Sequence, residues 1–291
     1  MSEEFNDNKT VHAQSSETIS GGGSGVAPDI DYVRPAEIPE QDLYHGHSFI
    51  TKWVFCQDAK VIGVQYFLTA VFTGIVGLIL SWLMRLQLGF PELVPFITAE
   101  HYYQFVTMHG MIMVVYFLTA LFLGGFGNYL IPLMVGARDM VFPYLNMVSF
   151  WMFFIAVCVL MASFFVPGGP TGAGWTLYPP QAILPGSPGA GMGIILMLTS
   201  LSLFVIGFTM GGLNYLITIL QARTRGMTLM RMPLTIWGIF TATALAMLAF
   251  PALLVSCIMM TLDKVLETSF FMPAIIQAGE VLDYSGGSPV L

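Results

Sequence analysis

Charged residues are scarce in this sequence. Lys, Arg, Asp and Glu together make up 9% of the 291 residues, whereas soluble globular domains usually carry about 25%. This deficit excludes an ordinary water-soluble domain and points to lipid as the solvent of most of the chain. The net charge of −7 comes mostly from the N-terminal tail and the final loop, and we expect no nucleic-acid partner.

Cysteine is also rare. Cys56 precedes the first apolar run, and Cys158 and Cys257 lie within later ones, so no disulfide framework or cysteine-rich metal site is expected. We expect no signal peptide before the first run, because residues 1–58 are polar, acidic and rich in Ser, Gly and Pro. The segment "SSETISGGGSGVAPD" predicts that residues 1–58 form a disordered tail.

The sequence is rich in long apolar runs. Five of them are free or nearly free of charge, and each exceeds the roughly 20 residues needed to cross about 30 Å of hydrocarbon. They are Val61–Met84, Tyr102–Val135, Phe142–Val166, Gly191–Leu220 and Met232–Leu262. The sequence therefore predicts an all-α integral membrane protein with five transmembrane helices.

The basic residues predict the orientation of these helices, since cytoplasmic loops carry an excess of Lys and Arg. Only Arg85 and Lys264 fall on the side opposite the N-terminus. The remaining basic residues share the side of the N-terminus: Lys9, Arg34, Lys52, Lys60, Arg138, Arg223, Arg225 and Arg231. We expect a multi-pass protein of the cell's inner (plasma) membrane, with residues 1–58 in the cytoplasm and the loop 167–191 outside.

His109 lies well inside the second apolar run, where an imidazole costs free energy unless it finds a partner. It could form a hydrogen bond to a neighbouring helix. It could also be an axial ligand of a buried metal or haem, because neutral imidazole is the commonest metal ligand. Gly110 and the later "GGFG" would let a flat macrocycle or a second helix approach closely. The residues alone leave both readings open.

His101 cannot share a metal with His109. The two are eight residues apart, which is roughly 12 Å along a helix axis, whereas two axial haem ligands must lie on opposite faces of one plane. The other histidines, His12, His45 and His47, lie in the tail. The chain therefore supplies one imidazole at membrane depth.

Several ordered blocks resemble subunit I of the haem-copper oxidases, the cytochrome c oxidase family. They are "MHG", "GNYLIPLMVGARDM", "GWTLYPP", "RGMTLMRMPLTIWG" and "SCIMMTLDKVLETSFF", and the resemblance covers roughly Val61–Leu291. It implies that residues 59–291 form the N-terminal half of a twelve-helix membrane domain, truncated before its sixth helix.

The resemblance also implies roles for individual residues. His109 corresponds to an axial ligand of a low-spin haem, and Arg85 to an arginine near the edge of that haem. Trp175 and Tyr178 correspond to residues of the external loop over the haem propionates. Without the resemblance, the two aromatic residues would be equally well explained as an interfacial belt.

The entrance of a proton channel is implied at Asp139, with Asn128 and Asn146 lining it. Asp139 lies on the predicted cytoplasmic side, where proton uptake from inside must begin. Without the resemblance, Asp139 would be an ordinary loop carboxylate beside Arg138, and Asn128 a helix cap or turn residue.

The chain departs from the family pattern further along this channel. A serine pair of the fourth helix is replaced by Gly207 and Phe208, and only Thr209 offers a hydroxyl nearby. Tyr144 stands where the family has an arginine, and "AKVIG" replaces "HKDIG". These changes leave His109 untouched but put in question the proton route beyond Asp139.

The resemblance implies a respiratory oxidase in which electrons pass through a low-spin haem to oxygen reduction coupled to proton translocation. The sequence ends at "GGSPVL", before the helices that hold a high-spin haem and copper, so we expect those cofactors only with a C-terminal half. The implied partners are that half, other oxidase subunits, the lipid bilayer, and cytochrome c or a quinol as electron donor. A quinol oxidase, a transporter and a non-catalytic membrane subunit remain alternatives.

Overall fold

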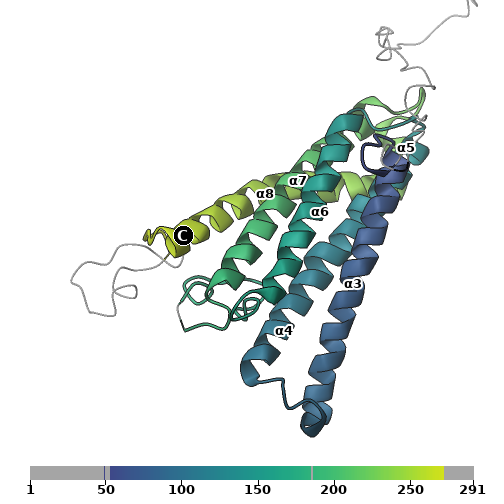
Figure 1. The fold of residues 1–291 in the computed structure, drawn as a ribbon. Coiled ribbons are helices and arrows are strands. Elements are labelled where there is room, and N and C mark those ends of the chain that lie inside the picture. The colour runs from purple at the N-terminus through teal and green to yellow at the C-terminus, as the bar shows by residue number, and fades with distance from the viewer. Residues whose placement is uncertain (1–48, 50–52, 185, 272–291) are drawn as a thin grey trace, which may run out of the picture. The chain divides into compact units, whose positions relative to one another are not determined.

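The computed structural model describes residue 49, residues 53–184 and residues 186–271 (Figure 1). This part of the chain contains five helices long and apolar enough to cross a membrane, and no strand. They span Ala59–Gly89, Ala99–Val135, Pro143–Phe165, Met192–Gln221 and Leu234–Val265. The predicted all-α membrane fold is thereby confirmed, and each predicted span coincides closely with one helix. The predicted tail of residues 1–58 lies almost entirely outside the described residues.

The five spans divide into labelled elements (Figure 1). The first span is α3 (Ala59–Gly89), and the fourth and fifth are α7 (Met192–Gln221) and α8 (Leu234–Val265). The second comprises α4 (Ala99–Met111), η2 (Ile112–Leu118), η3 (Ala120–Gly127) and α5 (Asn128–Val135). The third comprises α6 (Pro143–Ala162) and η4 (Ser163–Phe165). Two short 3₁₀ turns, η1 (Pro91–Leu93) and η5 (Leu229–Arg231), lie in the connections.

Side chains cap the starts of α3 and α4, where they accept hydrogen bonds from backbone amides that have no partner within the helix. The carboxylate of Asp58 accepts a hydrogen bond of 2.8 Å from the amide of Lys60 at the start of α3. Thr98 and His101 form a reciprocal capping pair at the start of α4. At the other end of the second span, Gly136 adopts a left-handed conformation with φ of 74°, as is usual where a helix ends.

The middle of the second span is wound more widely than an α-helix. Both η2 and η3 are π-type turns, and the hydroxyl of Thr119 bonds to the carbonyl five residues earlier, at Val114. Gly124 and Gly125 of η3 face the first span: a Cβ on Gly124 would lie 2.5 Å from the ring of Tyr66. It is therefore a second helix, α3, that approaches the "GGFG" segment.

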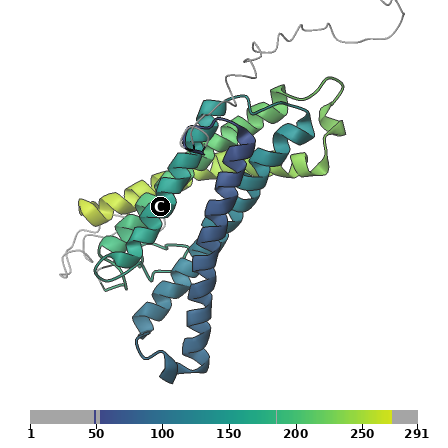
Figure 2. The same ribbon diagram turned by 45° about the vertical axis from the view of Figure 1, so that its right-hand side comes forward.

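The fourth span is the centre of the bundle. In an apolar 18-residue stretch of each helix, 56% of the residues of α7 are buried, compared with 11% of those of α8. An aromatic cluster of Tyr66, Tyr116, Phe153 and Phe204 fills the space between α3, the second span, α6 and α7. Figures 1 and 2 show α8 running obliquely to the other helices. Most of its apolar surface is thus left for lipid or for another chain.

Candidate functional site

His109 sits near the end of α4, half-buried against the first span. Its ring Nδ1 lies 2.9 Å from the carbonyl oxygen of Gly77 on α3. A carbonyl can only accept, so Nδ1 carries a proton, and in the neutral ring Nε2 then has the lone pair. The predicted hydrogen bond to a neighbouring helix is present. Metal-binding histidines usually have this same arrangement, with one nitrogen fixed by a carbonyl and the other available to the metal.

The loop of residues 167–191, which we predict to be external, packs beside His109. The amide of Gly174 donates a hydrogen bond of 2.9 Å to the hydroxyl of Thr107, two residues before the histidine. Trp175 then lies over Gly110, where an added Cβ would meet the tryptophan side chain at 3.5 Å. The fold thus brings Trp175 next to the turn of helix that carries His109.

Tyr178 and Arg85 are more loosely placed. Tyr178 is 70% exposed and Trp175 49% exposed, which fits either a surface covered by a cofactor or an interfacial aromatic belt. Arg85 is exposed near the outer end of α3. Among the described residues, no hydrogen bond or ion pair joins Arg85 to His109, Trp175 or Tyr178. Their common role therefore remains a prediction.

His101 has a structural task of its own. It is exposed at the start of α4, and its Nδ1 lies 3.1 Å from the carbonyl oxygen of Phe96. Within the described part of the chain, no group of three or more His, Cys, Asp or Glu side chains is arranged to hold a metal ion. Here a haem would be held by the single imidazole of His109.

Asp139 lies at the opposite end of the second span, in the loop before α6. Its Oδ1 accepts hydrogen bonds from the amides of Met140 (2.7 Å) and Ala59 (3.1 Å). Its Oδ2 is buried and has no hydrogen-bond partner among the described residues. Burial raises the pKa of this carboxyl from 3.8 to about 6, because the two amide bonds offset only part of the desolvation and Asp58 adds repulsion. Asp139 is thus not an ordinary solvated loop carboxylate.

The two predicted asparagines meet inside the bundle. Asn146 Nδ2 donates to Asn128 Oδ1 at 2.7 Å, and Asn128 Nδ2 donates to the Tyr215 hydroxyl at 2.7 Å. Both asparagines are fully buried. Asn128 also bonds to the carbonyl of Gly124 within a continuous helix, so it is not a helix cap. The structure brings Asn128 and Asn146 together and adds Tyr215, which the sequence reading missed; their place in a proton channel stays a prediction.

Asn214 fixes the loop that carries Asp139. Its Oδ1 accepts a hydrogen bond of 3.0 Å from the amide of Phe142, and its Nδ2 donates one of 3.1 Å to the Phe142 carbonyl. One turn further along α7, the hydroxyl of Thr218 accepts from the amide of Val141 at 3.1 Å. These bonds tie the loop to α7 and hold the carboxyl of Asp139 against the start of α3.

The places of the missing serine pair are filled by packing. An added Cβ at Gly207 would lie 3.0 Å from the carbonyl oxygen of Ser149, so α6 and α7 touch there. The ring of Phe208 stacks on Phe204 with centroids 4.5 Å apart and meets Tyr66 edge-on. Neither Gly207 nor Phe208 has a hydroxyl, so neither side chain can pass a proton along α7.

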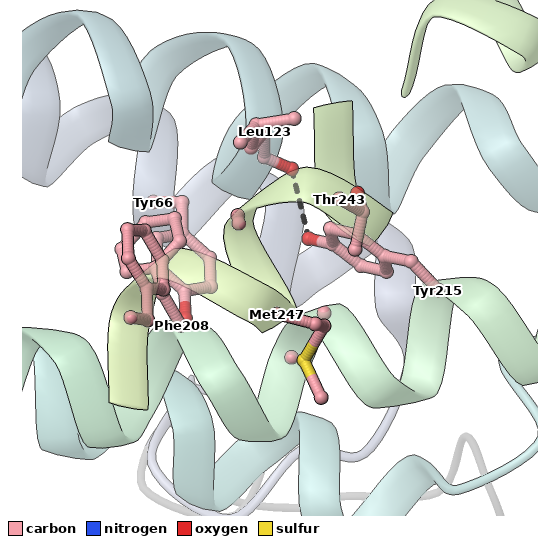
Figure 3. A pocket seen from close by; sticks show the side chains of 10 residues that line it. Tyr66, Leu123, Phe208, Tyr215, Thr243 and Met247 are labelled. Atoms are coloured by element: carbon pink, nitrogen blue, oxygen red, sulfur yellow. Dashed lines mark hydrogen bonds between the residues drawn. The ribbon is translucent and has the colours of Figure 1, made fainter. Parts of the chain in front are cut away.

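Two cavities lie on either side of this aromatic packing. The inner one, of about 10 Å³, is bordered by Tyr66, Phe208, Tyr215 and Thr243 among others (Figure 3). The other, called the outer cavity here for its position by the loop 167–191, has about 550 Å³ and is bordered by Trp175 and Tyr178 of that loop and by apolar residues of the second span, α7 and α8. His109 does not line either cavity.

The fold and these sites define a multi-pass helical membrane protein with one oriented imidazole and a buried polar cluster behind a loop carboxylate. The chain belongs to the family described as "Cytochrome C and Quinol oxidase polypeptide I", which matches residues 61–290. This confirms the predicted family.

Three relatives show the range of this similarity. The chain is 68% identical over 268 residues to "Alternative cytochrome c oxidase subunit 1" of Bradyrhizobium diazoefficiens, covering 90% of this chain and 45% of the relative. Over 221 residues it is 39% identical to "Quinol oxidase subunit 1" of Bacillus subtilis, covering 76% of this chain and 33% of the relative. Over 251 residues it is 35% identical to "Cytochrome c oxidase subunit 1" of Eremothecium gossypii, covering 84% of this chain and 43% of the relative. The chain thus spans less than half the length of these relatives.

Proposed function

We propose that this chain is part of a respiratory terminal oxidase and holds a low-spin haem that feeds electrons to oxygen reduction. The observation that carries this proposal is the geometry of His109, whose Nδ1 is fixed on the Gly77 carbonyl. That bond sets the ring tautomer and orientation before any haem binds. A haem bound at Nε2 would supply one-electron transfer, with a potential set by its axial ligands and its burial.

The neighbouring side chains support the same assignment. Trp175, seated over Gly110, and Tyr178 would lie above the haem propionates, and Arg85 would offset their negative charge. High-spin haem and copper, which the family implies, would be bound by a complementary C-terminal half, either of the same gene or as a separate chain. Residues 59–291 would then form one part of a larger membrane domain.

Proton uptake is proposed at Asp139. The carboxyl has a raised pKa and an unpaired Oδ2, so it can exchange protons close to neutral pH. Asn128 and Asn146 would orient water molecules behind it. The N-terminus and the Asp139 loop would face the cytoplasm of a cell bounded by an inner (plasma) membrane, as the distribution of Lys and Arg favours.

The relatives differ in the electron donor that their names indicate. The 68% identical relative is named a cytochrome c oxidase, which favours cytochrome c as the donor here. A quinol remains the second candidate, because a 39% identical relative is named a quinol oxidase. Family membership weighs against an unrelated transporter or a purely structural subunit. Other oxidase subunits are expected partners.

Oxygen consumption tests this proposal. Purified alone, the 291-residue chain should consume no oxygen with reduced cytochrome c or a quinol, because only one imidazole at membrane depth is available for metal centres. Co-expression with a chain carrying the complementary helices should give a low-spin haem spectrum and sustained oxygen uptake. Uptake by the chain alone, or no haem in the co-expressed complex, would overturn the assignment.

Cysteine labelling tests the orientation. In a background without the native cysteines, Met230→Cys should react with a membrane-impermeant reagent only from the cytoplasm, and Gly186→Cys only from outside. Both positions suit the test because Met230 is 91% exposed and a Cβ at Gly186 meets nothing within 4 Å. External labelling at Met230 would reverse the topology and remove Asp139 from the side of proton uptake.

A further inference from the structure

The small inner cavity contains an unpaired hydroxyl. Thr243, on α8, is only 3% exposed, and its Oγ1 has no hydrogen-bond partner among the described residues. Two other threonines in the helices around it bond to a carbonyl one turn back: Thr209 to Val205 and Thr261 to Cys257. A buried hydroxyl without such a bond costs free energy. The cavity of about 10 Å³ that it borders is therefore the place to look for its partner (Figure 3).

Two further residues with hydroxyls, Tyr215 and Tyr66, line the same cavity. Tyr215 donates to the Leu123 carbonyl at 2.8 Å and accepts from Asn128 at 2.7 Å, which leaves one lone pair on its oxygen. The hydroxyl of Tyr66 lies 3.2 Å from Ser149 Oγ and also keeps capacity to accept. Tyr66 on α3, Tyr215 on α7 and Thr243 on α8 thus line one small space (Figure 3).

We propose that this cavity binds one water molecule, held by Thr243 and by the hydroxyls of Tyr215 and Tyr66. A buried water needs room of about 10–15 Å³ and two to four polar partners. This cavity has about 10 Å³, at the lower end of that range, and three of its lining residues carry hydroxyls. The water accepts the hydrogen bond that Thr243 otherwise lacks and donates to the tyrosine oxygens. It extends the chain Asn146–Asn128–Tyr215 by one step, onto the fifth span.

This water takes the place of the hydroxyls absent at Gly207 and Phe208. Phe208 closes the direct path along α7, whereas Thr243 offers a hydroxyl on the neighbouring α8. Phe250, one of the rings beyond it, borders both the inner and the outer cavity.

The relay rests on the proposed uptake of protons at Asp139. The bound water accepts a proton from water on the cytoplasmic side and releases another to water in the outer cavity, so its own proton count does not change. The released proton goes to the oxygen-reducing haem-copper centre proposed for the complementary half. Thr243 acts as a positioning residue, since it holds the water and does not itself exchange protons.

The test uses the assembled oxidase with three variants. Thr243→Val keeps the side-chain shape but removes the hydroxyl, and should lower turnover and the rate of proton uptake about fivefold, an effect of the size of one hydrogen bond. Thr243→Ser should restore both rates. Thr241→Val is the matched control, because Thr241 is exposed two residues away on the same helix and should change nothing. The low-spin haem spectrum should be the same in all three.

A map of the unsubstituted oxidase that resolves ordered water provides a readout independent of activity and of variant folding. It should show one water within hydrogen-bonding distance of Thr243 Oγ1, and an empty cavity would overturn the proposal. Unchanged proton uptake in Thr243→Val, with Asp139→Asn impaired, would overturn the relay but leave the proposed function intact. Unchanged uptake in both variants would instead remove proton entry at Asp139.

Discussion

Replacing His109 by alanine should abolish the low-spin haem signal of the assembled oxidase and reduce its turnover to background. The imidazole is the one ligand that this chain offers at membrane depth, and its ring is already oriented by the Gly77 carbonyl. Altering only a hydrogen-bond partner of a metal ligand typically costs about 10- to 100-fold in affinity or activity, so removing the ligand should cost more. Optical spectra and haem quantification of the purified complex measure the effect.

His101→Ala is the matched control for this experiment. It removes an imidazole from the same helix, but one that is exposed and pairs with Thr98 and Phe96 at the helix start. It should leave the haem signal intact. Membrane insertion should survive both substitutions, because neither alters the five long apolar helices that determine it. A normal low-spin spectrum in His109→Ala would show that the ligand lies elsewhere.

The spans could be predicted from the sequence because lipid imposes a simple requirement. Each spanning segment must be about 20 residues long, apolar and internally hydrogen-bonded. The predicted run Val61–Met84 therefore lies wholly within the observed Ala59–Gly89. The wide turns of η2 and η3 could not be predicted, since a helix with bonds to the fifth residue back has the same apolar composition as an α-helix. Contacts such as Tyr66 against Gly124 distinguish the two only in three dimensions.

The site was partly predictable for a related reason. A histidine in an apolar run is conspicuous, and the resemblance to a known family singled out Asn128 and Asn146, whose contact the structure shows. Tyr215 and Thr243 gave no such signal, because tyrosine and threonine are common in membrane helices and fit apolar packing. Their importance comes from lining one cavity from two consecutive helices, α7 and α8. Only the packing of α7 against α8 reveals that arrangement.

Asp139→Asn should slow turnover and proton uptake of the complete oxidase by about tenfold or more, since positioned proton-transfer groups commonly contribute at least that much. The amide keeps the size of the side chain and can still accept from the amides of Ala59 and Met140. Haem content should therefore be unchanged. Glu92→Gln is the matched control, because it removes an exposed carboxylate from the turn that follows the other end of α3. Full turnover with full proton translocation in Asp139→Asn would exclude this carboxyl as the entrance.

Asp139→Asn should also change stability, in the direction opposite to its effect on turnover. The folded-state pKa of Asp139 is raised from 3.8 to about 6, so the folded protein holds this proton more tightly than the unfolded chain does. The contribution of Asp139 to stability is therefore fully present below pH 3.8 and is lost as the pH rises through about 6. Because asparagine does not ionise, Asp139→Asn should unfold at a higher temperature than the unsubstituted oxidase at pH 7.5, and the difference should shrink as the pH falls below 6. A variant that is slower yet more stable at pH 7.5 would show that the buried carboxyl is retained for proton transfer, whereas lower stability at that pH would make it a structural residue.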